Sequence, residues 1–229
     1  MPPQDLDDLD EELEFTDNPA PRLAVCLCLD TSGSMSGEKL DGLNSGIQQF
    51  LEAVRNEPRA RDSVEVAVVT FDDTAELVAD FSTVERIAVP PLLAGGSTAL
   101  GAGVRLALDQ LALRKARYGS AGIEYYQPWL VLMTDGRPTD PQAVADAARR
   151  AAQQVQERKL TVMAIGIGAD ADLAALQPLS PKRPPVRLKG LAFRELFEWL
   201  SRSAVRVSES TPGEEVEADL DGLKRWATF

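Results

Sequence analysis

Short continuous apolar runs alternate along this chain with longer stretches in which apolar residues recur at helical spacing. Such runs are typical of strands covered on both faces of a parallel sheet, and apolar residues at every third or fourth position are typical of helices with one buried face. This order predicts an α/β fold, a doubly wound, Rossmann-like and mostly parallel sheet with helices on both faces. Strands are expected at 23–29, 64–71, 129–133 and 160–167, helices at 37–55, 99–117, 140–158, 170–176 and 193–205, and loops at 118–126 and 180–185.

One antiparallel strand is expected at an edge of this sheet. The sequence Asp72-Asp73-Thr74 separates the strand at 64–71 from a second extended run at 75–81, which predicts a hairpin. Aspartate is common in turns because its carboxylate bonds to nearby backbone amides, so Asp72 and Asp73 are interpreted as turn formers rather than as ligands.

The two ends of the chain differ from the region between them. Residues 1–21 are rich in carboxylates and prolines and poor in apolar residues, which predicts a flexible acidic arm. The region 22–205 carries the strand and helix pattern and is expected to form one domain. The tail at 206–229 is acidic and then apolar at Leu223, Trp226 and Phe229, so we expect it to dock on the domain or on a partner.

Composition and charge exclude several classes of function. The chain of 229 residues has a formal net charge of −12 and no histidine. A strongly negative surface repels phosphate backbones and anionic lipid head groups, so neither nucleic acid nor a membrane is expected as a partner. Without histidine, catalysis that depends on an imidazole base is excluded, and the commonest zinc ligand is missing.

The two cysteines indicate the cellular compartment in which the protein is expected. Cys26 and Cys28 lie two positions apart in one apolar run, so their side chains would point to the same face of a strand and no disulfide is expected between them. A C-x-C metal or redox pair is a less favoured alternative, because no second pair of thiols or imidazoles accompanies it. Buried thiols fit a reducing cytosol, and no apolar run is long enough to span a membrane, so a cytoplasmic location is expected.

Hydroxyls and carboxylates gather in three segments that lie at junctions of the predicted strands and helices. In a doubly wound sheet, ligands bind beyond the carboxyl ends of the strands, so these segments should meet in space. Hard oxygen donors of this kind suit Mg²⁺, and we expect a divalent-metal site built from Asp30, Ser32, Ser34, Thr98 and Asp135. The three segments are Asp30-Thr31-Ser32-Gly33-Ser34, Gly95-Gly96-Ser97-Thr98 and Thr134-Asp135-Gly136.

These residues resemble the metal-ion-dependent adhesion site of von Willebrand factor A (VWA) domains, whose pattern is D-x-S-x-S, a later Thr and a later Asp. The match has no departure at Asp30, Ser32, Ser34, Thr98 or Asp135. The resemblance implies the VWA fold over about 22–205, with Mg²⁺ or Mn²⁺ at the top of the sheet. It also implies that the hydroxyls bind the metal directly, while the two aspartates act partly through water.

A narrower resemblance is to the bacterial tellurium-resistance-associated VWA proteins called TerY. It rests on the segment Pro128-Trp129-Leu130-Val131-Leu132-Met133-Thr134-Asp135-Gly136-Arg137-Pro138-Thr139-Asp140 and on the helix that begins at Phe193. This likeness implies a cytoplasmic protein of a bacterial stress response, with phosphatases and kinases as partners. In the VWA family, partner binding can be linked to movement of the last helix, here 193–205.

The ligand set favours a binding module over an enzyme. A cation held mainly by neutral hydroxyls keeps much of its charge, so it should accept an Asp or Glu side chain from another protein. Two alternatives remain: a structural subunit with a stabilising metal, and a Mg²⁺-dependent phosphohydrolase or phosphotransferase. The last is less favoured because no lysine is placed by a motif at the strand ends, and Lys39 is expected to face solvent. Met35, Arg137 and either Tyr125 or Tyr126 are candidates for the rim of the site.

Overall fold

The computed structural model describes residues 15, 18–214, 216 and 219–228, and within them seven strands form one sheet. The strand order is β3-β2-β1-β4-β5-β6-β7. The pairs β1–β2, β1–β4, β4–β5 and β5–β6 are parallel, whereas β2–β3 and β6–β7 are antiparallel. The strands are β1 (Leu23–Asp30), β2 (Val64–Phe71), β3 (Ala75–Thr83), β4 (Trp129–Thr134), β5 (Thr161–Gly166), β6 (Val186–Leu188) and β7 (Ala227–Thr228).

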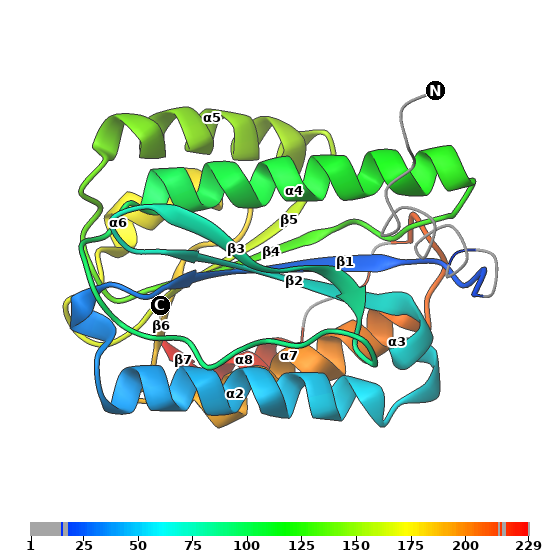
Figure 1. Ribbon diagram of the computed structural model, residues 1–229, viewed down its shortest axis with the longest axis horizontal. Helices are drawn as coiled ribbons and strands as arrows, with labels where there is room; N and C mark the ends of the chain where they lie inside the picture. The colour runs from blue at the N-terminus through cyan, green and yellow to red at the C-terminus, as the bar shows by residue number, and fades with distance from the viewer. Residues whose placement is uncertain (1–14, 16–17, 215, 217–218, 229) are drawn as a thin grey trace.

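Helices cover both faces of this sheet (Figure 1). On one face lie α4 (Leu100–Ala121) and α5 (Pro141–Gln156), and on the other lie α2 (Glu38–Arg55), α7 (Phe193–Ser208) and α8 (Leu220–Trp226). The predicted fold class, a mostly parallel doubly wound sheet with β3 as an antiparallel edge strand, is confirmed. Short elements complete the chain: η1 (Gly33–Met35), α3 (Pro58–Ser63), α6 (Leu173–Leu176) and η2 (Gln177–Leu179).

Strand β1 lies in the middle of the sheet and shows why the core has two halves. Alternate residues of a strand point to opposite faces. Leu23, Val25, Leu27 and Leu29 pack in the half that contains α2 and α7, whereas Ala24, Cys26 and Cys28 pack in the half that contains α4 and α5. The two cysteines therefore share one face, as predicted, and both are free thiols whose pKa is raised by burial.

Several elements differ from the sequence-based prediction. Helix α4 continues to Ala121, well into the predicted loop at 118–126, because Tyr118 is fully buried and extends the apolar face of the helix. The predicted helix at 170–176 is shorter, and η2 follows it. The short elements α3, β6, α8 and β7 were not predicted, because runs of two to seven residues carry too little periodicity to be recognised.

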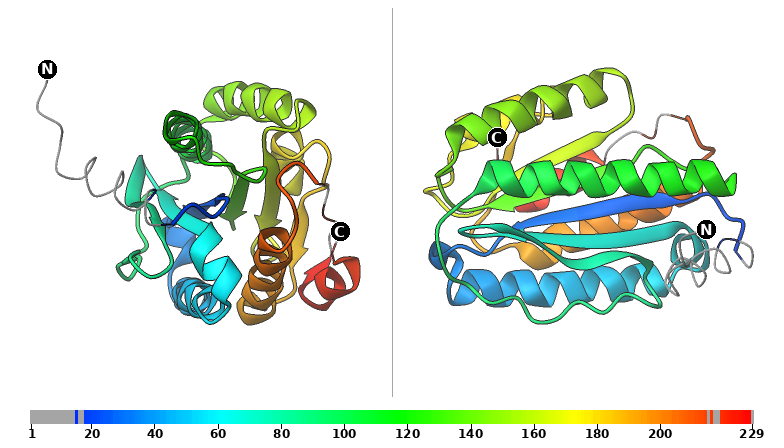
Figure 2. Two further views of the ribbon diagram at one scale, coloured as in Figure 1. Left: turned by 90° about the vertical axis from the view of Figure 1, so that its right-hand side faces the viewer. Right: turned by 45° about the horizontal axis from the view of Figure 1, so that its top comes forward.

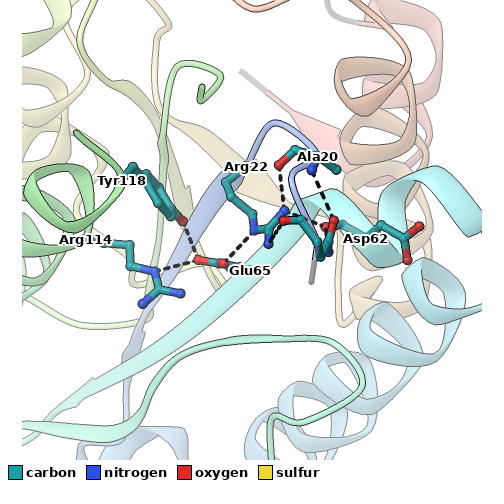
Figure 3. A network of polar contacts seen from close by, with 7 residues as sticks. Ala20, Arg22, Asp62, Glu65, Arg114 and Tyr118 are labelled. Carbon is teal, nitrogen blue, oxygen red and sulfur yellow. Dashed lines mark hydrogen bonds and ion pairs between the residues drawn. The ribbon is translucent and has the colours of Figure 1, made fainter. Parts of the chain in front are cut away.

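A buried carboxylate joins several elements at the end of the sheet where β1 and β2 begin (Figure 3). Glu65 of β2 is fully buried, and its two oxygens accept hydrogen bonds from Arg22 Nε at 3.0 Å and from Arg114 Nε at 2.6 Å. The Tyr118 hydroxyl also donates to Glu65, and burial together with the Glu65 carboxylate raises the pKa of Tyr118, so this hydroxyl keeps its proton. Charged partners thus satisfy a carboxylate that would be very costly to bury alone.

Both ends of the chain contact the domain within the described residues. Phe15 is buried against Tyr118, with the Arg114 guanidinium carbon 5.1 Å from its ring centroid. At the other end, Trp226 packs on Trp199 of α7 with ring centroids 5.5 Å apart, and β7 pairs with β6. Most of the predicted arm at 1–21, and Phe229 of the tail, lie outside the described residues. No helix among those described is both long and apolar enough to cross a membrane.

Close packing of α2 on α7 gives a test of this arrangement. A Cβ placed on Gly46 would lie 2.2 Å from Cδ2 of Phe197, whereas a Cβ on the exposed Gly119 of α4 would meet nothing within 4 Å. We expect Gly46→Ala to lower the free energy of unfolding by about 1–3 kcal/mol, because overpacking outweighs the better helix propensity of alanine. The matched Gly119→Ala should raise it by roughly 0.5–1 kcal/mol. Urea denaturation measures both, and equal shifts would contradict the packing.

Candidate metal centre

The candidate metal centre lies at the edge of the sheet where the parallel strands end, near η1 at the left of Figure 1. Asp30 is the last residue of β1, and Asp135 directly follows β4. Leu29 pairs with Met133 in the parallel ladder, so Asp30 and Thr134 come next on adjacent strands. Backbone register therefore brings the two carboxylates together.

Asp30 is held in place by hydrogen bonds to both of its oxygens. Oδ1 accepts from the backbone N–H of Ser32 at 2.8 Å, and Oδ2 accepts from the hydroxyl of Thr134. The residue is fully buried, and burial raises the pKa of its carboxyl against the lowering effect of these hydrogen bonds. The nearby Asp135 carboxylate raises it further, and a cation at this site would have the opposite effect because it stabilises the ionised form.

The other predicted ligands lie on the same side of the site. The Oγ atoms of Ser32 and Ser34 are 3.0 Å apart, and the Ser34 hydroxyl donates to Asp135 Oδ1 at 2.6 Å. Thr98 lies alongside them, across the small Gly136. A Cβ placed on Gly136 would lie 3.1 Å from Thr98 Oγ1 and 3.9 Å from Ser34 Oγ, so both hydroxyls are close to this glycine. The structure thus brings all five sequence-predicted residues into one cluster.

The loop that carries Thr98 is fixed by backbone contacts and by one aspartate. The Gly33 N–H donates to the Gly96 carbonyl at 3.1 Å, and Asp73 Oδ1 accepts from the Ser97 N–H at 2.8 Å. Gly96 has a φ of 66°, and a Cβ there would lie 2.8 Å from the Asp73 carboxylate. Asp73 therefore does more than form the predicted turn, since it holds the Thr98 loop against the β2–β3 hairpin.

Asp140 has a different role from an N-cap of its own helix. It does precede Pro141 at the start of α5, but its side chain makes no cap hydrogen bond there. Its two carboxylate oxygens instead accept from the backbone N–H groups of Gly101 at 3.0 Å and Ala102 at 2.9 Å, in the first turn of α4. This contact ties the segment after Asp135 to the helix that follows Thr98.

The donor set fits a small, hard cation. Adjacent ligands of an octahedral Mg²⁺ ion are about 2.9 Å apart, given metal–oxygen distances of about 2.0–2.1 Å. The separation of 3.0 Å between Ser32 Oγ and Ser34 Oγ agrees with that spacing. The described residues contain no cluster of three or more Cys, Asp or Glu side chains, so a softer or purely carboxylate metal site has no counterpart here.

Lys39 is a residue of the site that sequence reasoning missed. Its Nζ donates to Asp135 Oδ2, and it also donates to the Ser34 carbonyl at 3.2 Å, so the prediction that Lys39 faces solvent is wrong. Lys39 lies in the first turn of α2, shortly after η1, and its side chain extends toward Asp135. Its sequence distance of five residues from Ser34 was the signal that could have revealed it.

A cavity of about 650 Å³ opens beside this cluster. Arg137 lines it together with Asp135 and Lys39, so Arg137 does lie at the rim. Met35 is fully buried in the core instead, and Tyr125 and Tyr126 lie near the start of β4, at the other end of the sheet. These three residues are therefore not part of the rim. The tyrosines follow the end of α4, and this helix runs the length of the sheet away from the site.

The chain belongs to the von Willebrand factor type A domain family, whose model matches residues 24–191. Domains of this family commonly mediate protein–protein interaction or adhesion and often bind a divalent metal. An uncharacterized protein of Synechocystis sp. is 27% identical over 193 residues, which are 78% of this chain and 42% of that protein. The chain thus spans about two fifths of the length of the curated relative that it matches.

Solved structures share the fold at low sequence identity. The pilus adhesin SpaC from Lactobacillus rhamnosus GG has a TM-score of 0.65 at 15% identity, over 81% of this chain and 31% of that one. The vWF domain of the type V pili tip protein Mfa5 from Porphyromonas gingivalis has a TM-score of 0.61 at 12% identity, over 86% and 99% of the two chains. A von Willebrand factor type A protein from Catenulispora acidiphila has a TM-score of 0.58 at 19% identity, over 81% and 43%.

Lys39 gives a direct test of the charge balance at this site. Replacing it with methionine leaves Asp135 without its cationic partner, so we expect Lys39→Met to lower the free energy of unfolding in chelator by about 1–2 kcal/mol. The same change removes an ammonium that repels a second cation, so Mg²⁺ affinity should rise roughly tenfold. Lys39→Arg retains the charge and is the control. Denaturation in chelator and calorimetric Mg²⁺ titration measure the two effects, and unchanged values for Lys39→Met would contradict this role.

Proposed function

We propose that the chain is a metal-dependent protein-interaction module, with Mg²⁺ or Mn²⁺ at a metal-ion-dependent adhesion site. Ser32, Ser34 and Thr98 would bind the cation through their hydroxyls, and Asp30 and Asp135 would act partly through water. The observation that carries this proposal is the convergence of the five side chains on one edge of the sheet, with a Ser32 Oγ to Ser34 Oγ separation of 3.0 Å that fits an octahedral ion.

The charge of this ligand set supports an acidic partner. Both oxygens of Asp30 already accept hydrogen bonds from the protein, which limits how much of its charge reaches a metal directly. Neutral hydroxyls neutralise a divalent ion only weakly, so the bound cation would attract an Asp or Glu side chain of another protein. Lys39 and Arg137 line the adjoining cavity and would favour the same anionic group.

The resemblance to TerY proteins suggests where such a module would work. We propose that this chain acts in the cytoplasm of a bacterium, in a stress-response system of the tellurium-resistance type, and that a kinase or phosphatase supplies the acidic side chain. The binding function is assigned to residues 22–205, with residues 206–229 as a docked tail. Direct chemistry on tellurium is not part of the proposal, because the site contains no soft ligands.

An enzymatic alternative needs consideration because Lys39 lies beside Asp135. A phosphotransferase with an aspartate nucleophile uses a lysine near the strand ends, and the position of Lys39 meets that requirement. Asp30 is poorly suited as the nucleophile, since it is fully buried and both of its oxygens accept hydrogen bonds. The family neighbours are mostly adhesins and interaction modules, which also favours binding over catalysis.

Thr98 provides the sharpest test of the proposed function. Thr98→Ala removes a hydroxyl ligand, whereas the matched Thr98→Ser retains it. We expect Thr98→Ala to weaken Mg²⁺ and Mn²⁺ binding by at least about tenfold in calorimetric titration, and Thr98→Ser to bind as the wild type does. In pull-downs from the native cell with mass-spectrometric identification, partners recovered in Mg²⁺ should be lost both in chelator and with Thr98→Ala.

Two outcomes would contradict the proposal in different ways. If Thr98→Ala kept its partners but melted at a lower temperature than the wild type in Mg²⁺, the metal would be a structural element of a larger assembly. If the protein hydrolysed phosphate esters and Asp30→Asn abolished that turnover, the site would be catalytic. Asn retains the shape of Asp30 and can bond to both Ser32 and Thr134, so loss of folding does not complicate this comparison.

A further inference from the structure

A second cavity, of about 970 Å³, lies at the opposite end of the molecule from the candidate metal centre. It is formed around the first residues of β4 and β5, including Trp129 and Thr161, and by the last turns of α7. The segment that follows α7, coloured orange-red, crosses this end of the molecule in the left view of Figure 2. The volume is in the range of small-molecule sites.

Cations gather around this cavity although the chain as a whole is acidic. The sequence has 24 Lys and Arg against 36 Asp and Glu, so a cluster of positive charge runs against its average composition. Among the described lining residues the acidic one is Glu214, and its carboxylate accepts from the Thr211 N–H at 3.1 Å. The lining cations are Lys115, Arg158, Lys159, Lys182, Arg183 and Arg206.

Some of this positive charge is poorly balanced. Lys159 pairs with Glu157 at 2.8 Å, but the half-buried Lys115 donates to the neutral side-chain oxygen of Gln154 at 3.2 Å. Burial lowers the pKa of Lys115, and the nearby charges of Lys159 and Arg150 lower it further. An anion in the cavity would relieve this repulsion, as would any other added negative charge.

Arg158 lines the cavity with its backbone in a conformation that glycine adopts more easily. It is the one non-glycine residue with positive φ in the described part of the chain, at 57°. This left-handed conformation, just beyond the end of α5, is where helices usually place Gly or Asn, and for other residues it costs about 1 kcal/mol or more. The end of the helix accounts for this conformation, because the Arg158 N–H donates to the Val155 carbonyl at 3.2 Å and the Lys159 N–H donates to the Gln154 carbonyl at 2.8 Å.

Four aromatic residues line the cavity beside the cations, and one of them is exposed. Tyr126, Trp129 and Trp199 are buried and line the cavity, whereas Tyr125 lines it with 39% of its surface exposed. Lysine and arginine bind phosphate oxygens, and exposed aromatic rings stack on nucleobases. The combination of clustered cations and aromatic rings matches a ligand with both groups.

We propose that this cavity binds a nucleoside polyphosphate, with its phosphates on the lysines and arginines and its base stacked on the Tyr125 side. A compact ligand of this kind places its charges within about 8 Å of the cations, the screening length at physiological ionic strength. A long acidic peptide would extend over the rest of a surface that carries most of the net charge of −12, which disfavours it.

The experiment titrates ATP into the full chain in EDTA, so that the candidate metal centre takes no part. Trp129 and Trp199 report binding through their fluorescence, and calorimetry gives the affinity. We expect ATP to bind roughly tenfold more tightly than inorganic tripolyphosphate, because stacking adds to the charge interactions. Equal affinity for the two compounds, or no binding of ATP, would overturn the proposal.

Arg158→Gly separates binding from folding. Glycine adopts positive φ without strain, so the free energy of unfolding should stay the same or rise while ATP affinity falls roughly tenfold. Arg194→Ala removes an equal charge from an exposed site at the start of α7 and should leave ATP affinity unchanged. Wild-type ATP affinity in Arg158→Gly would overturn the proposal. So would displacement of ATP by a synthetic peptide of residues 1–14, which carries seven carboxylates.

Discussion

The candidate site depends on one constraint, the backbone register that places two carboxylates at the ends of adjacent parallel strands. Because Leu29 pairs with Met133, Asp30 and Asp135 must lie at the same edge of the sheet, and both are buried. Buried like charges are costly unless donors or cations balance them. The contacts of Thr134 with Asp30, and of Ser34 and Lys39 with Asp135, meet that requirement.

A comparison with Glu65 shows what is unusual about this balance. Glu65 is also buried, but two arginines and a tyrosine satisfy it fully from within the protein. Asp30 and Asp135 rely instead on hydroxyls, a backbone amide and a single lysine whose side chain is 30% exposed. The first arrangement closes a structural junction, whereas the second is the arrangement on which the proposed metal site rests. Buried carboxylates thus have charged partners on several sides at one end of the sheet, and mainly neutral donors at the other.

Much of this organisation could be predicted from the sequence. The apolar runs gave the central strands, and the strand-to-helix junctions gave the five clustered residues, because both are local patterns with strong periodicity or turn chemistry. The contacts of Asp73 and Asp140 could not be predicted, since each depends on which loops meet in space, and the closeness of Lys39 to Ser34 in sequence was the one hint of its role. In the sequence, Lys39 lies at a polar position of a predicted helix, where a solvent-facing side chain is expected. Asp140 directly precedes Pro141, which is the usual place for the N-cap of the helix that follows. Strand β7 has only two residues, which is too short to show an alternation of apolar and polar positions.

The two cavities follow a common electrostatic logic. With a net charge of −12, the surface repels anions at long range, so any anionic ligand must be held by short-range contacts. Lys39 and Arg137 supply such contacts beside the carboxylate pair, and Arg158 and Lys115 supply them at the far end of the sheet. An anion that makes few short-range contacts would gain too little binding free energy to overcome the long-range repulsion, and it would not bind. If both proposals hold, selectivity at either end would arise from a few cations set against the charge of the whole chain.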